Sequence, residues 1–99
     1  MRVEILMSWS GVTKEQYELI RKSVNWEGDT PKGAVLHLAA FNKDGCQVTD
    51  IWESEADFNS FVKNRLYPQT MKAGIKNEPR IEIIPVHEIF APALQRLGN

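Results

Sequence analysis

The sequence has few of the features that point directly to a chemical activity. It contains one cysteine, Cys46, so no disulfide can form within the chain. Its two histidines, His37 and His87, lie far apart and match no recognisable metal-ligand spacing. We therefore predict no metal site, and we interpret Cys46 as a small strand residue rather than a nucleophile.

Long apolar runs and clusters of one charge are also missing. No stretch approaches the roughly 18 apolar residues that a transmembrane helix needs, and the first residues show no signal-peptide core. The formal net charge is -1, and the lysines and arginines are spread along the chain without interleaved aromatics. We expect neither a membrane nor a nucleic-acid partner, and a cytoplasmic location by default.

The composition is that of an ordinary folded domain. The 99 residues are 42% hydrophobic and 25% charged, which suits one core but not two. We expect residues 1–99 to form a single domain.

Local patterns predict the order β-α-β-β-α-β. We expect strands at residues 2–8, 34–41, 46–53 and 80–89, where β-branched and aliphatic residues gather between turn formers. Thr13 and Gln16 form a capping box before a helix over 14–24, and Ser54 precedes a second helix that Pro68 should end or kink near Tyr67. This order indicates an α+β, ferredoxin-like fold with a four-stranded antiparallel sheet.

The hairpin predicts which side chains share a face. With Asp44 and Gly45 as a two-residue turn, one side of the hairpin should pair Phe41 with Val48, Ala39 with Asp50, and His37 with Trp52. The other side carries Leu36, Leu38, Ala40, Thr49 and Ile51. Because this second side has no strongly polar group, we assign it to the helices.

The first side then needs another cover. A large exposed apolar face on a monomer usually marks an interface or a groove. We therefore predict a homodimer, forming a dimeric α/β barrel through the non-helix face. The residues assigned to that interface are Val35, His37, Ala39, Phe41, Val48 and Trp52.

His37 and Asp50 are the candidate catalytic residues. A carboxylate beside an imidazole fixes its tautomer, which suits proton abstraction, and Trp52 could stack on a planar ligand. The candidate substrate-binding residues are Trp52, Arg65, Tyr67, His87 and Phe41. Structural roles stay open for five of them: a satisfied polar pair of His37 and Asp50 in an interface, a core Trp52, a surface ion pair of Arg65, and a solvated His87.

The segment Asp50-Ile51-Trp52-Glu53-Ser54, followed by Phe58 and Phe61, resembles the antibiotic-biosynthesis-monooxygenase-like group of dimeric α/β barrels. The resemblance implies a dimeric barrel and a cavity that binds a small molecule. That superfamily includes cofactor-independent monooxygenases acting on polycyclic phenols, haem-degrading enzymes, small isomerases and many proteins of no known role. The fold alone does not choose among them.

The haem-degrading branch would place a tryptophan and a ligand histidine where this sequence has Phe61 and Met71. We therefore expect no haem and no other cofactor. The leading hypothesis is a homodimer that binds a small, planar, largely apolar molecule and acts as a cofactor-independent monooxygenase-like enzyme. One alternative is a non-catalytic ligand-binding or sensing module. Another is an interaction protein, which predicts that no cavity of ligand size, roughly 300 Å³ or more, survives dimerisation.

Overall fold

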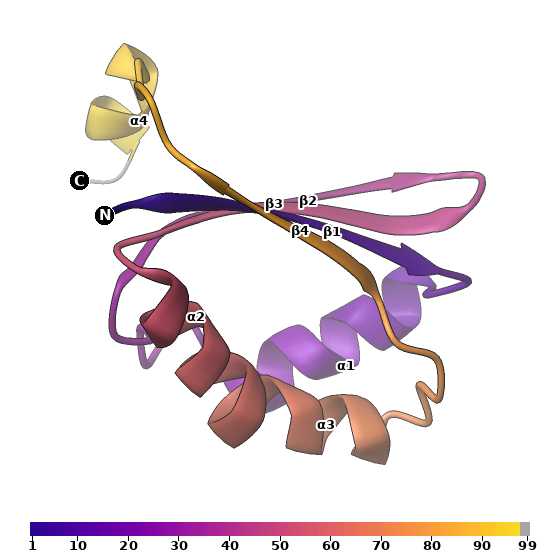
Figure 1. The fold of residues 1–99 in the computed structure, drawn as a ribbon. Helices are drawn as coiled ribbons and strands as arrows, with labels where there is room; N and C mark the ends of the chain where they lie inside the picture. The colour runs from indigo at the N-terminus through magenta and orange to yellow at the C-terminus, as the bar shows by residue number, and fades with distance from the viewer. Residues whose placement is uncertain (98–99) are drawn as a thin grey trace.

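The structure, a computed structural model, describes residues 1–97 and places four antiparallel strands in one sheet with three helices on one of its faces (Figure 1). The strands are β1 (Val3–Ser10), β2 (Ala34–Asn42), β3 (Gly45–Trp52) and β4 (Arg80–Pro85), in the order β2-β3-β1-β4. The helices are α1 (Lys14–Val24), α2 (Glu55–Phe61), α3 (Tyr67–Lys72) and α4 (Pro92–Leu97). The predicted α+β class and ferredoxin-like element order are confirmed.

Helix α1 has the predicted bounds because both of its ends are capped. The Thr13 side chain accepts a hydrogen bond from the Gln16 amide at 3.1 Å, and Gln16 Oε1 accepts one from the Thr13 amide at 3.0 Å. Asn25 ends the helix in the left-handed conformation with φ 58°. The capping fixes the rotation of α1, so that Ile20 and Val24 are buried against the sheet.

Of the two outcomes expected at Pro68, an end or a kink, the helical run does not end there but continues to Lys72. Helix α2 begins after the cap Ser54 and is followed by a π-helical segment, Val62–Leu66, and then by α3. Pro68 lies where the π-helical segment meets α3, and the helical run continues through it although proline has no N–H to donate. None of the helices in residues 1–97 is long and apolar enough to cross a membrane.

The hairpin turn lies one residue earlier than expected. Strand β2 ends at Asn42, whose side-chain oxygen accepts hydrogen bonds from the amides of Asp44 (2.9 Å) and Gly45 (3.1 Å). Gly45 has φ 142°, and a Cβ there would collide with the carbonyl of Trp9. The pairing therefore shifts by two residues: Phe41 lies opposite Cys46, Ala39 opposite Val48, and His37 opposite Asp50.

The assignment of the two sheet faces was wrong. Val48, Asp50 and Trp52 are buried under the helices, whereas Leu38 is 53% exposed on the open face. The whole predicted interface, Val35, His37, Ala39, Phe41, Val48 and Trp52, lies on the helix side, where it packs in the core or lines a cavity. Polarity misled the prediction because the polar groups of this face bond to one another and to a side chain of α1.

Strand β4 ends earlier than predicted, at Pro85 rather than near residue 89. It is an edge strand, where a proline is tolerated because one side of the strand has no ladder partner. Beyond it the chain projects past the sheet, and α4 lies on the side away from α1, α2 and α3 (Figure 1). Ile89, Phe90 and Leu94 are exposed along this segment.

Two neighbouring residues of α1 test which surface of the helix forms the core. Ile20 is 6% exposed and Leu19 is 58% exposed. We expect Ile20→Ala to lower the free energy of unfolding by about 2–5 kcal/mol, because it leaves a cavity in the core. Leu19→Ala should change it by about 0.5 kcal/mol or less. Urea denaturation of both variants measures the difference, and equal effects would contradict this packing.

Candidate functional site

A cavity of about 230 Å³ lies between the sheet, α1, α2 and the loop of residues 25–33. Its walls are mainly apolar and include Met7, Ile20, Val48, Phe58, Phe61 and Leu66. The volume is below the roughly 300 Å³ typical of small-molecule pockets, so by that criterion alone an interaction protein stays open. However, an apolar cavity of about 150 Å³ already holds benzene. This cavity therefore has room for a ligand of one or two rings.

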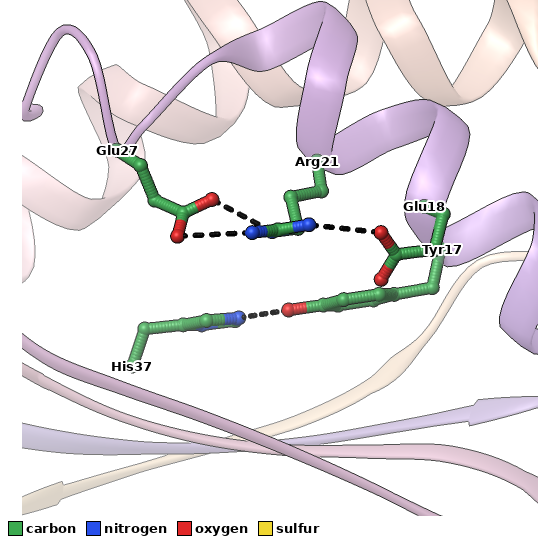
Figure 2. Close-up of polar contacts among 5 residues, drawn as sticks. All are labelled: Tyr17, Glu18, Arg21, Glu27 and His37. Atoms are coloured by element: carbon green, nitrogen blue, oxygen red, sulfur yellow. Dashed lines mark hydrogen bonds and ion pairs between the residues drawn. The ribbon is translucent and has the colours of Figure 1, made fainter.

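Four side chains form a continuous hydrogen-bonded chain along the cavity. Trp52 Nε1 donates to Asp50 Oδ2 at 3.1 Å, and Asp50 Oδ1 lies 2.7 Å from His37 Nδ1. His37 Nε2 lies 2.8 Å from the Tyr17 hydroxyl (Figure 2). These hydrogen bonds run from Trp52, which is 3% exposed, through Asp50 and the partly exposed imidazole of His37 to Tyr17.

The fold places each member of this chain. His37 and Asp50 are direct cross-strand partners on β2 and β3, and Trp52 follows Asp50 by two residues on the same face of β3. Tyr17 reaches the pair from the sheet-facing side of α1. The hydrogen bonds therefore join two strands and a helix.

The proton positions follow from the chemistry of the three polar groups. An ionised carboxylate only accepts hydrogen bonds, so His37 donates its Nδ1–H to Asp50. In the neutral imidazole, Nε2 then accepts the hydrogen bond of the Tyr17 hydroxyl. If Nε2 gains a proton, the same contact reverses and the imidazolium donates to the Tyr17 oxygen. The protonation of Nε2 thus sets the direction of the His37–Tyr17 hydrogen bond, whereas both bonds to Asp50 keep their direction.

Burial keeps Tyr17 in its protonated form. Loss of solvent is the main reason that the pKa of Tyr17 rises to about 12, and the nearby Cys46 and Glu18 add to the effect. Burial also raises the pKa of the Cys46 thiol, which lines the same cavity. Both groups are therefore neutral near pH 7.

Aromatic rings hold the polar chain in place. The ring centroid of Trp26 lies 4.9 Å from that of His37, and Phe41 meets Tyr17 edge-to-face at 5.8 Å. At the other end, Phe61 lies 5.2 Å from Trp52. Such packing restricts the rotamers of the hydrogen-bonded groups.

Two arginines fasten the loop of residues 25–33, which carries Trp26. Arg21 pairs with Glu27 of the loop at 2.6 Å and with Glu18 at 2.9 Å (Figure 2). The hydrogen bond to Glu27 is the main reason that the pKa of Arg21 is raised. Arg65 donates to the carbonyl of Val24, the last residue of α1, at 2.9 Å and to the carbonyl of Asp29 in the loop at 2.8 Å.

The structure brings together three of the seven residues predicted for the site. His37, Asp50 and Trp52 line the cavity. Phe41 packs edge-to-face against the ring of Tyr17, and Arg65 donates hydrogen bonds to backbone carbonyls that hold the loop of residues 25–33. Their roles toward a ligand stay predictions.

The other candidates lie outside the cavity lining. Tyr67 is 52% exposed at the start of α3, and His87 is exposed beyond the end of β4. Glu4 lies on the open face of β1, because its neighbours Val3 and Ile5 point into the core.

The sequence analysis did not identify Tyr17 and Trp26 as residues of the site. A signal for Tyr17 was present. It lies on the apolar stripe of α1 with Ile20 and Val24, and a tyrosine turned toward a core needs a partner for its hydroxyl. Trp26 had no such signal, since its place over His37 depends on the path of a loop.

Solved structures share this fold. A protein of unknown function from Nitrosomonas europaea is 13% identical with a TM-score of 0.67, covering 92% of this chain and 93% of its own. SnoaB, a cofactor-independent oxygenase from Streptomyces nogalater, is 10% identical with a TM-score of 0.61, covering 89% and 94%. A monooxygenase from Streptomyces coelicolor, solved with the ligand nanaomycin D, is 17% identical with a TM-score of 0.53, covering 91% of each chain.

At these identities the comparison establishes the fold. Structures described as putative antibiotic biosynthesis monooxygenases, from Chloroflexus aurantiacus and Deinococcus radiodurans, share the fold as well, so the resemblance seen in the sequence is confirmed at the level of the fold. No protein-family model matches the sequence, and no curated protein matches it.

The raised pKa of Tyr17 can be measured directly. The chain has two tyrosines, so in Tyr67→Phe only Tyr17 contributes a phenolate absorbance. We expect that signal to appear near pH 12, about two units above an unfolded tyrosine. Because the unfolded chain loses this proton first, stability should be unaffected below about pH 10 and fall between there and pH 12. Complete ionisation of the folded variant by pH 10 would show that the hydroxyl is solvated.

Proposed function

We propose that the chain binds a small, planar, largely apolar molecule in this cavity and oxidises it with molecular oxygen, as a cofactor-independent monooxygenase-like enzyme. One observation carries the proposal: a His37–Asp50 pair, with a proton-accepting nitrogen directed at Tyr17, inside a cavity with mainly apolar walls. Two structures of the same fold are described as an oxygenase and a monooxygenase, which supports the reaction type.

The reaction needs the substrate itself as reductant. An aromatic hydroxyl that loses its proton leaves an electron-rich anion, which can pass electrons to dioxygen without a cofactor. In the overall change a ring CH₂ or its enol tautomer and O₂ become C=O and water, so the substrate supplies both the carbon that is oxidised and the electrons. His37 takes up the proton, and Asp50 stabilises the imidazolium that forms. The apolar walls keep water away from the anion.

A non-catalytic ligand-binding or sensing module is the second candidate. The observation that favours it is the completeness of the hydrogen bonding: both nitrogens of His37 and both oxygens of Asp50 already have partners. In that case the pair only fixes the shape of the cavity and offers hydrogen bonds to a ligand. The two candidates share a binding site and differ in oxygen consumption.

We also propose that two copies assemble through the open face of the sheet. Leu38 is 53% exposed and Ile84 36% exposed on this face, and Leu6 and Ile51 lie between them. The segment after β4 projects past the sheet on the same side (Figure 1) and exposes 85% of Phe90. A second copy would cover these apolar surfaces, together with Glu4, which lies between Ile51 and Ile84, and Glu82 of the edge strand β4. The interface residues replace those expected from the sequence.

His37→Gln tests the acid-base role. Glutamine keeps hydrogen bonding but does not titrate near neutral pH, so we expect turnover to fall about a hundredfold or more. The change in stability should be about 0.5–1.5 kcal/mol, the size of a lost hydrogen bond. Oxygen consumption is measured across a panel of phenols and quinols, with thermal unfolding of the same samples.

His87→Gln is the matched control, because His87 is exposed outside the cavity. It should leave both measurements unchanged. If His37→Gln lowers the melting temperature but consumes oxygen as fast as the unaltered protein, His37 has a structural role.

Leu38→Glu tests the dimer. Light scattering of the unaltered chain should give twice the mass of one chain, because the open face is covered by a second copy. Glutamate at Leu38 would place an unpaired charge in that interface, at a cost of several kcal/mol, and should produce a monomer. Leu19→Glu, on the 58% exposed outer side of α1, is the control and should remain dimeric. A monomer from the unaltered chain at micromolar concentration would rule out this assembly.

A further inference from the structure

We propose that Tyr17 is a catalytic residue that relays the proton of the substrate's hydroxyl to His37. The inference rests on the proposed function for the presence of a ligand in the cavity. It adds a residue and a proton path.

The first argument is that His37 has no free nitrogen. Nδ1 is bound to Asp50 at 2.7 Å and Nε2 to the Tyr17 hydroxyl at 2.8 Å. The rings of Tyr17 and His37 are nearly coplanar, with an interplanar angle of 3°, and lie end to end (Figure 2). The tyrosine ring therefore occupies the axis along which a ligand would approach Nε2.

The second argument is that the Tyr17 oxygen can accept another hydrogen bond. A phenolic oxygen has acceptor capacity beyond its own O–H, and Tyr17 lines the cavity. Its ring is held between Trp26 at 5.9 Å and Phe41 at 5.8 Å. A ligand hydroxyl that donates to this oxygen completes a chain through His37 to Asp50.

The third argument is that Tyr17 can give up its proton only while it receives another. Since its pKa is raised to about 12, a free tyrosinate is costly here, and the hydroxyl must regain a proton as it gives one up. The titratable and charged groups around it are Glu18 and Arg21 of α1, Glu27 of the loop, and Cys46 and Asp50 of β3. Arg21 is already paired with both glutamates, which leaves His37 as the base within hydrogen-bond reach.

The step is balanced by two proton shifts. The substrate O–H bond breaks as its proton bonds to the Tyr17 oxygen. At the same time the Tyr17 O–H bond breaks and that proton bonds to His37 Nε2. The products are a substrate anion, a neutral Tyr17 that donates to it, and an imidazolium paired with Asp50. No electron moves in this step, and the charge separation stays within one line of hydrogen bonds.

The test uses binding rather than turnover, so that its result does not depend on oxygen chemistry. The probes are 4-nitrophenol, whose phenolate absorbs visible light, and 4-nitroanisole, which has the same ring but no acidic proton. Tyr17→Phe removes the relay oxygen, and the remaining phenyl ring still blocks Nε2. Tyr67→Phe is the matched control, because Tyr67 is 52% exposed and outside the cavity.

In the unaltered protein and in Tyr67→Phe, we expect the acid dissociation constant of bound 4-nitrophenol to be about tenfold higher than that of the free probe. The reason is that a hydrogen bond and a nearby positive charge stabilise its anion. In Tyr17→Phe the bound probe should remain a neutral phenol. 4-Nitroanisole should bind all three proteins equally, which shows that the cavity is intact. For any oxidised phenol, Tyr17→Phe should lower turnover about a hundredfold.

The outcomes separate the relay from the proposed function. Equal ionisation of the probe in Tyr17→Phe and in the unaltered protein overturns the relay alone. Failure of both probes to bind the unaltered protein overturns the relay together with the binding function. Ionisation that depends on Tyr17 without any oxygen consumption supports the relay and identifies the site as a phenol-binding one.

Discussion

A carboxylate can be buried in an apolar cavity only if donors satisfy both of its oxygens, and Asp50 imposes this condition on the rest of the site. At 6% exposure it is held by the Nδ1–H of His37 and the indole N–H of Trp52. Hydrogen bonds to a charged group contribute about 1.5–3 kcal/mol each, and an unpaired buried charge costs several. The condition fixes the His37 tautomer, which in turn fixes the donor and acceptor roles of Tyr17.

The same condition explains how much of this molecule could be predicted from the sequence. Short-range patterns worked where the cause is local: the capping box at Thr13 and Gln16 gives the bounds of α1, and the alternation in β2 and β3 correctly places His37, Asp50 and Trp52 on one face. Choosing which face lies under the helices failed. A face that carries a histidine and an aspartate looks exposed until the hydrogen bonds that neutralise their polarity are known, and one of those bonds comes from α1.

The sequence therefore predicted one part of the candidate site, the His37–Asp50 pair, and not the part formed by the loop. The pairing of His37 with Asp50 needed only hairpin register, and a turn placed one residue too late turned a direct pair into a diagonal one. The contribution of Trp26 depends on a loop held by Arg21 and Arg65, whose partners are a side chain and backbone carbonyls distant in sequence. Contacts of this kind have no period or motif, so only the tertiary structure shows them.

The two edges of the sheet bear on how the chain avoids fibril-like aggregation. An edge strand offers unpaired amides and carbonyls to any neighbouring strand. Here β2 is irregular between Ala34 and Leu36, and β4 has six residues and ends at Pro85, which has no amide hydrogen. Both interruptions make strand-by-strand extension of the sheet into a neighbouring molecule unfavourable. The sheet therefore lacks the regular, uninterrupted edges from which open-ended fibres grow.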